Sequence, residues 1–162
     1  MPIAAALLPE FDQEMATTRR VLESLPAEQL DYRPHPKSWT MGGLATHIAT
    51  LPNWGKMTIE LDAFDMSEPQ ERAPEGLTVA EIVERFDQSV AAARATLQGA
   101  SDETMMAPWS LRDGGKEVFK MPRAAVFRGF VMNHLIHHRA QLSLYFRLAG
   151  LQPPFIYGPP AE

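Results

Sequence analysis

The chain has 162 residues, of which 45% are hydrophobic and 22% are charged. This composition is typical of one globular domain with a sizeable core, so we expect a single domain over residues 1–162. The net charge of −5 argues against nucleic acid as a partner, because nucleic-acid binders usually present a basic face. Cysteine is absent, which excludes disulfides, cysteine-based zinc sites and a cysteine nucleophile.

Neither the start of the sequence nor its interior predicts export or membrane insertion. The apolar residues 1–8 have no basic flank, and Glu10 and Asp12 follow closely, so we do not expect a signal peptide. No uninterrupted apolar run reaches the roughly 18 residues that cross a bilayer. We therefore expect a cytoplasmic protein without a membrane partner, and the lack of cysteine agrees with that compartment.

The first half of the chain predicts two helices. Apolar residues recur at three-and-four spacing over Ile3–Ser24, which is typical of an amphipathic helix. Pro26 and a proline-rich stretch at 33–36 should end this helix and force an extended connection. A second helix is predicted over Thr40–Phe64, with Pro52 bending it.

The second half predicts two more helices and a hairpin. The third helix is predicted over Thr78–Gln98, and Thr78 with Glu81 forms a capping-box pattern at its start. An Asp-Gly turn within Trp109–Phe119 predicts a small β-hairpin. The last helix is predicted over Pro122–Ala149. These elements predict an all-α fold, a four-helix bundle with a small β-hairpin before the last helix.

Three histidines are the main candidates for a functional site. His134 and His138 are four residues apart in the last predicted helix, so they share one face, whereas His137 points toward its edge. His47 lies at the centre of the apolar face of the second helix. Three imidazoles that point into one core can bind a divalent metal ion and leave coordination positions open for water or substrate.

A structural role is the alternative for each of these histidines, since single histidines on apolar faces are usually hydrogen-bonded core residues. Burying three unpaired imidazoles costs free energy, and one metal ion satisfies all three acceptor nitrogens at once. We therefore predict a mononuclear metal site at His47, His134 and His138. His35, between two prolines, is expected to be a solvated side chain.

The neighbouring polar and aromatic residues are harder to assign. Helical phase favours a surface or interface position for Arg139, and a role in binding an anion at the site is the alternative. Asn133 and Gln141 either hydrogen-bond the histidines or a substrate, or are structural. The aromatic residues near the predicted site either line a pocket or belong to the core: Trp39, Trp54 and Tyr145. Spacing places no carboxylate as a general base, so catalytic residues stay unassigned.

At these residues the chain resembles the DinB/YfiT-like superfamily of bacterial four-helix-bundle proteins. The resemblance covers nearly the whole chain and is carried by four segments: Ser38–His47, Trp109–Phe119, Asn133–Leu142 and Tyr157–Pro159. It implies an up-down-down-up bundle, often dimeric, with a divalent ion held by one histidine of the second helix and two of the last. Those roles fall on His47, His134 and His138. Nickel, zinc, iron and manganese are all compatible with this implied site, and Ala140 stands where the family often has glycine.

The resemblance also implies a class of reaction. Characterised members include thiol S-transferases that use bacillithiol, mycothiol or glutathione, and a mycothiol-dependent isomerase, while many members have no assigned reaction. Because this chain has no cysteine, any thiolate must arrive as a small-molecule substrate. We expect a metal-dependent enzyme that transfers a low-molecular-weight thiol to an electrophile or hydrolyses a small substrate.

The alternative is a non-catalytic homodimeric bundle that binds a metal ion or another ligand. Apolar residues of the last helix that lie off the histidine face favour a homodimer contact: Val126, Met132, Ile136, Leu144 and Phe146. Their burial by the tail and hairpin within one subunit is the competing explanation.

Overall fold

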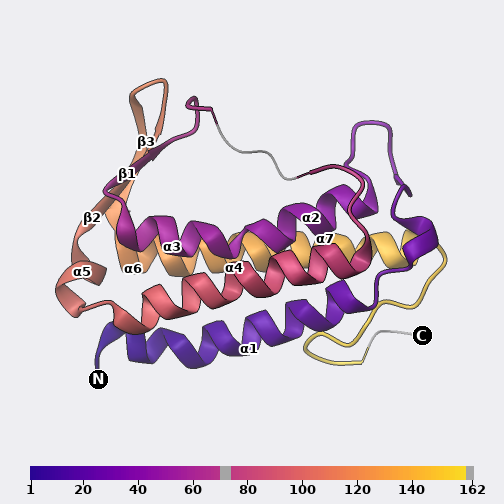
Figure 1. Ribbon diagram of the computed structural model, residues 1–162, viewed down its shortest axis with the longest axis horizontal. Coiled ribbons are helices and arrows are strands. Elements are labelled where there is room, and N and C mark those ends of the chain that lie inside the picture. Colours follow the sequence, from indigo (N-terminus) through magenta and orange to yellow (C-terminus); the bar gives the residue numbers. More distant parts are fainter. Residues whose placement is uncertain (70–73, 160–162) are drawn as a thin grey trace.

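Long helical stretches lie side by side along the longest dimension of the molecule (Figure 1). The computed structural model describes residues 1–69 and 74–159. Helix α1 (Ile3–Glu23) and the last helical stretch of the chain run in one direction. Helices α2 (Met41–Thr50), α3 (Pro52–Glu60) and α4 (Val79–Gly99) run in the opposite direction. A single 3₁₀ turn, η1 (Ala27–Gln29), lies in the connection from α1 to α2.

The helix boundaries follow local chemistry closely. Thr40 caps α2 by accepting a hydrogen bond from the backbone of Gly43, and α3 begins directly at Pro52. Proline suits the first position of a helix, where its missing N–H is not needed, but it interrupts a helix that is already running. The predicted capping box at the start of α4 is confirmed, since Thr78 and Glu81 exchange side-chain and backbone hydrogen bonds.

The predicted hairpin is present, but it belongs to a larger sheet. Strands β2 (Pro108–Asp113) and β3 (Lys116–Pro122) pair antiparallel around two glycines with positive φ. Strand β1 (Ala63–Asp65) pairs parallel with β2, so the order is β1-β2-β3. Asp65 joins the two parts by accepting backbone hydrogen bonds from Gly114 and Gly115.

The predicted all-α four-helix-bundle class is therefore wrong, because the described residues also form a three-stranded mixed sheet and more than four helices. The predicted second helix divides at Pro52 and ends at Glu60, and residues predicted to continue it form β1 instead. Pairing with β2 supplies hydrogen bonds that the segment would otherwise make within a helix. A short helix, α5 (Asp102–Met106), was also not predicted.

The last helical stretch has three parts: α6 (Arg123–Ala125), the π-helical segment η2 (Val126–Met132) and α7 (Asn133–Leu148). The wider π-helical segment ends at Met132, two residues before His134. Helix α7 is regular from its first residue, Asn133, so His134 and His138 share a face as expected. Single π-helical turns inside α-helices are often found at functional sites.

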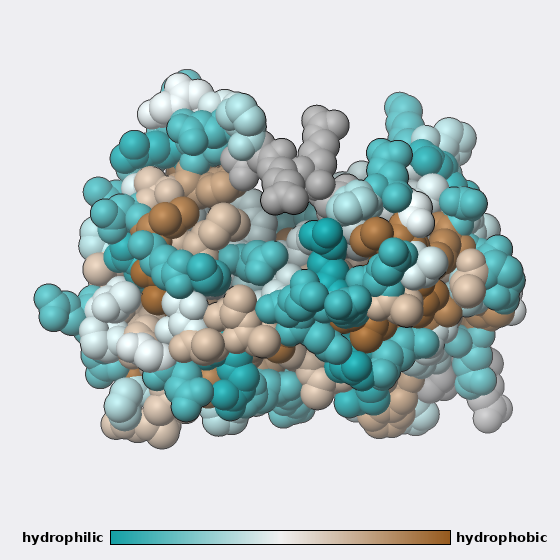
Figure 2. Space-filling view, viewed as in Figure 1, coloured by the Kyte–Doolittle hydropathy of each residue, from teal (hydrophilic) through white to brown (hydrophobic). Residues whose placement is uncertain are grey.

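Two apolar clusters stabilise this arrangement. The main core lies between the long helices and includes Phe11, Phe86 and Phe127. A smaller cluster around Trp109, Leu111 and Val126 packs the sheet against the start of the last helical stretch. Figure 2 shows apolar side chains at both ends of one face, separated by a hydrophilic middle. Within the described ranges, no helix combines the length and apolar character needed to cross a membrane.

Candidate metal centre

Helices α2 and α7 bring three histidines together. His47 lies on α2, while His134 and His138 lie one turn apart on α7. One ring nitrogen from each lies within 4.8 Å of the others, and all three side chains are partly buried. The centroid of the His47 ring is 4.7 Å from that of His138 and 5.4 Å from that of His134. The histidines are thus close enough to bind a single metal ion.

The histidine environment favours neutral rings. Burial, with a smaller contribution from the His138 and His134 rings, lowers the pKa of His47 from 6.5 to about 4. Burial and neighbouring histidines also lower the pKa of His134. The pKa of His138 is lowered by burial, although the hydrogen bond that it donates to Gln141 opposes this effect. A neutral imidazole keeps the nitrogen lone pair that a metal ion needs.

One nitrogen of the site lacks a partner. Nε2 of His47 is buried and has no hydrogen bond to any residue that the structure describes. A buried polar atom without a partner is destabilising, so such atoms usually indicate a missing ligand or water. A cation shared with His134 and His138 would satisfy this nitrogen, so the residues present fit a metal ion.

Gln141 orients one of the three rings. Nδ1 of His138 lies 2.7 Å from Oε1 of Gln141, and Nε2 of the same glutamine lies 3.0 Å from Nε2 of His137. Because the amide oxygen only accepts, Nδ1 of His138 must donate, which leaves its Nε2 free as an acceptor. Hydrogen bonds of this kind fix the tautomer and direction of metal-binding histidines. Sequence reasoning left this role of Gln141 undecided.

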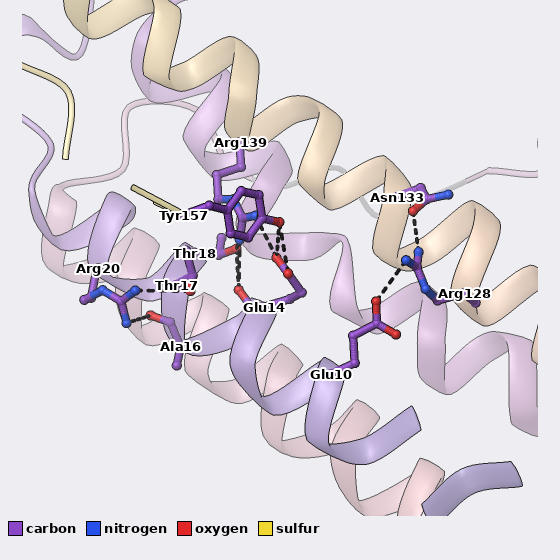
Figure 3. Close-up of polar contacts among 10 residues, drawn as sticks. All are labelled: Glu10, Glu14, Ala16, Thr17, Thr18, Arg20, Arg128, Asn133, Arg139 and Tyr157. Atoms are coloured by element: carbon purple, nitrogen blue, oxygen red, sulfur yellow. Dashed lines mark hydrogen bonds and ion pairs between the residues drawn. The ribbon is translucent and has the colours of Figure 1, made fainter. Parts of the chain in front are cut away.

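Asn133 has a different partner. Its Oδ1 accepts a hydrogen bond from Arg128, whose guanidinium also pairs with Glu10 of α1 at 2.9 Å (Figure 3). These contacts join the start of α7 to α1. Asn133 therefore has a structural role in holding the two helices together.

The expectation of a surface or interface position for Arg139 is wrong. Its side chain is only 1% exposed and lies between α7 and α1. The guanidinium donates to Glu14 and Thr18 of α1 and to the hydroxyl of Tyr157 in the C-terminal tail (Figure 3). A charged residue enters the interior here because an opposite charge and several acceptors are already in place.

Trp39 is the aromatic residue nearest to the histidines. Its ring centroid lies 4.7 Å from that of His47 and 5.7 Å from that of His138. Half of the residue is exposed, so it is not a core residue. Tyr145 ties Trp39 to α7 by a hydrogen bond from its hydroxyl to the Trp39 carbonyl oxygen, at 3.3 Å. Trp54 lies farther away and packs against Phe64 and Phe130 of the smaller cluster.

Known proteins are similar to this chain in sequence and in fold. The DinB family model matches residues 1–162. The uncharacterized protein YrdA of Bacillus subtilis strain 168 is 30% identical over 156 residues, which cover 96% of this chain and 88% of YrdA.

Two solved structures show the same fold. A DinB-like protein from Bacillus cereus ATCC 10987 superposes with a TM-score of 0.70 at 24% identity, over 93% of this chain and 95% of that one. The DinB-like protein YjoA from Bacillus subtilis superposes with a TM-score of 0.71 at 20% identity, over 94% of this chain and 99% of that one. With a family match over its full length and a relative at this level of identity, the chain belongs to the DinB family.

Proposed function

We propose that this protein binds one divalent metal ion through His47, His134 and His138. We further propose that it uses the ion to transfer a low-molecular-weight thiol to an electrophile, or to hydrolyse a small substrate. The observation that carries the proposal is that one ring nitrogen from each of the three histidines lies within 4.8 Å of the others. The buried Nε2 of His47, which has no hydrogen-bond partner among the described residues, supports it. Nickel, zinc, iron and manganese all accept imidazole ligands.

Three imidazoles would leave coordination positions open on a bound ion, which would then lower the pKa of a coordinated thiol or water and polarise an electrophile. Residues of the chain itself orient the histidines and hold them in place. Gln141 holds the ring of His138 in one tautomer, and the Trp39 ring packs beside His47 and His138. The buried Arg139 fixes α7 against α1 and so keeps His134 and His138 at their distance from α2.

Metal binding is tested by elemental analysis of protein purified without an affinity tag. We expect about one equivalent of a divalent metal in the wild type and almost none in His134→Ala. His137→Ala is the matched control, because His137 is an exposed histidine on the same helix outside the triad, and it should keep its metal. Equal metal content in both variants would refute the site.

Catalysis is tested by a screen of thiols against a model electrophile, with esters as hydrolysis substrates. Activity that disappears in His134→Ala, while the far-ultraviolet circular dichroism spectrum stays unchanged, would support the enzyme. A metal-loaded protein that converts none of these compounds would instead support the non-catalytic binding protein. If the variant loses both metal and helical structure, the ion has a structural role.

A homodimer remains a prediction, but fewer of the apolar residues predicted at its contact are exposed than the sequence suggested. Val126, Met132 and Phe146 are buried in the core of their own chain. Of the residues predicted at the contact, Leu144 is strongly exposed, and Leu148 lies one turn beyond it. Sedimentation at micromolar concentration measures the assembly state directly.

A further inference from the structure

An open hollow of about 560 Å³ adjoins the candidate metal centre on the His138 side. One wall is α7, where His138, Gln141, Tyr145 and Leu148 follow one another at spacings of three and four. Residues at these spacings share one helix face, so the face that carries His138 continues as a mainly apolar wall. The volume lies within the range of small-molecule sites, which is roughly 300–1,000 Å³.

The hollow exposes large apolar side chains beside the polar histidines. Leu144 is 53% exposed and Leu148 is 55% exposed, and Trp39 faces them from the connection before α2. Pro34 and Leu44 complete the apolar lining, and His35, Lys37 and Ser38 also line the hollow. Apolar surface left in water next to a few converging polar groups is typical of a binding site for the apolar part of a ligand.

A second hollow, of about 500 Å³, lies on the His47 side and has a different character. Its lining carries both charges, from Arg33, Asp31 and Glu75, together with three threonines. Trp39 lines both hollows and contacts both adjacent histidines. The histidine cluster is therefore flanked by one polar and one apolar hollow, and this division would separate the two ends of an amphipathic ligand.

The described C-terminal tail does not supply the missing apolar partner. The hydroxyl of Tyr157 donates to Glu14 of α1, and its ring lies under the guanidinium of Arg139, 5.1 Å from the centroid. These contacts hold the tail on the α1 side of α7, whereas the hollow is bounded by α7 and the connection before α2. Leu144 and Leu148 therefore stay exposed on the α7 side that lines the hollow.

We propose that this apolar hollow binds the alkyl or aryl part of a small molecule whose polar head lies at the three histidines. The inference rests on the proposed metal site, since the head is expected to be a metal-binding group. It narrows the substrate class to compounds with an apolar tail, such as an alkyl or aryl electrophile or an acyl compound. Small, fully polar substrates would leave the leucines in water.

A series of straight-chain hydroxamic acids tests this inference, because their head group binds zinc while the tail varies. Calorimetric titration of zinc-loaded protein should show affinity rising about twofold for each added methylene from acetohydroxamic to octanohydroxamic acid. That factor corresponds to roughly half the benefit of fully burying a methylene, as suits an open hollow. The double variant Leu144→Ser/Leu148→Ser should lose most of this dependence on chain length while still binding acetohydroxamic acid.

Val118→Ser is the matched control, because Val118 is 54% exposed but lies on β3, outside the hollow. It should keep the chain-length dependence of the wild type. Acetohydroxamic acid that binds with no gain for longer tails would overturn the inference and leave the metal site standing. Failure of every hydroxamic acid to bind zinc-loaded protein would overturn both.

Two other outcomes would also overturn the inference. A chain-length dependence that persists in the double variant would place the tail elsewhere, for example in the hollow beside His47. A flat series combined with a dimer that the double variant dissociates would assign Leu144 and Leu148 to contact with a second copy of the chain.

Discussion

Arg139 and Glu14 form a buried ion pair between α7 and α1, with Nη2 2.7 Å from Oε2 and side-chain exposures of 1% and 9%. Arg139 directly follows His138, so it points about 100° away around the helix, toward α1. One face of α7 thus presents histidines to α2 while another is held to α1 by charge. The ion pair between Arg139 and Glu14 thus helps to hold α7, and with it the two histidines, in a fixed position.

Glu14→Gln should therefore strongly destabilise the protein. The substitution leaves a buried guanidinium without an anionic partner, and we expect the free energy of unfolding to fall by about 3 kcal/mol. Urea denaturation followed by circular dichroism measures this change. Asp87→Asn is the control, since it weakens the exposed pair with Arg19 and should cost less than about 1 kcal/mol. Similar losses in both variants would contradict this account.

Gln141→Leu should weaken metal binding by about 10- to 100-fold, because it removes the acceptor that fixes the tautomer of His138. Gln141→Glu should retain most of the affinity, since a carboxylate accepts the same hydrogen bond. Competition with a chelator measures both affinities. Nitrogen-15 spectra of metal-free protein provide a second readout, in which the Nδ1-protonated form of His138 should predominate only where residue 141 is an acceptor. Wild-type spectra and affinity in Gln141→Leu would refute its positioning role.

Gly55→Ala should destabilise the contact between α3 and η2. A Cβ at this position would lie 2.8 Å from Cε2 of Phe127, a ring with no exposed surface. We expect a loss of about 1–2 kcal/mol, the net of overpacking and the better helix propensity of alanine. Gly129→Ala is the control, because nothing lies within 4 Å of its added Cβ, and it should be neutral or slightly stabilising. Urea denaturation of both variants tests the difference.

Asp65 should make stability depend on acid pH. Hydrogen bonds from Ser67, Gly115 and Gly114 lower its pKa from 3.8 to about 2 in the folded protein. The unfolded chain then binds a proton more tightly, so the stabilisation is complete above about pH 4 and is lost as pH falls through 2. Urea midpoints of the wild type and Asp65→Asn should converge between pH 4 and pH 2. A difference that stays constant over this range would contradict the assignment.

The spacing of residues was sufficient to place much of the candidate site. His134 and His138 share a face because they are four apart, and the local helix is regular over that interval. The capping box at Thr78 and the hairpin turn were also read from adjacent residues. Such features depend on contacts within a few residues, which a local pattern records directly.

Other features depended on partners that are distant in the sequence. Residues 63–65 form a strand because they pair with residues 110–112 of β2. No local sequence pattern predicts a pairing partner so far along the chain. Arg139 is buried because Glu14 faces it across 125 residues. A signal for this pair was present, since Glu14 interrupts the apolar face of α1 between Phe11 and Thr18, but helical phase alone did not identify its partner.

The sequence by itself determined the long helices, the hairpin turn and the set of histidines that could share a metal ion. The helices and the histidine faces follow from periodicity at helical spacing, and the hairpin turn follows from the Asp-Gly pair. The tertiary structure decided how those histidines are supported and what surrounds them. Gln141 beside His138, the buried Arg139, the parallel strand β1 and the two hollows around Trp39 all arise where separate segments meet. The physical reason is that hydrogen bonds, desolvation and packing between distant segments are collective, whereas sequence periodicity reports only which face of each helix is apolar.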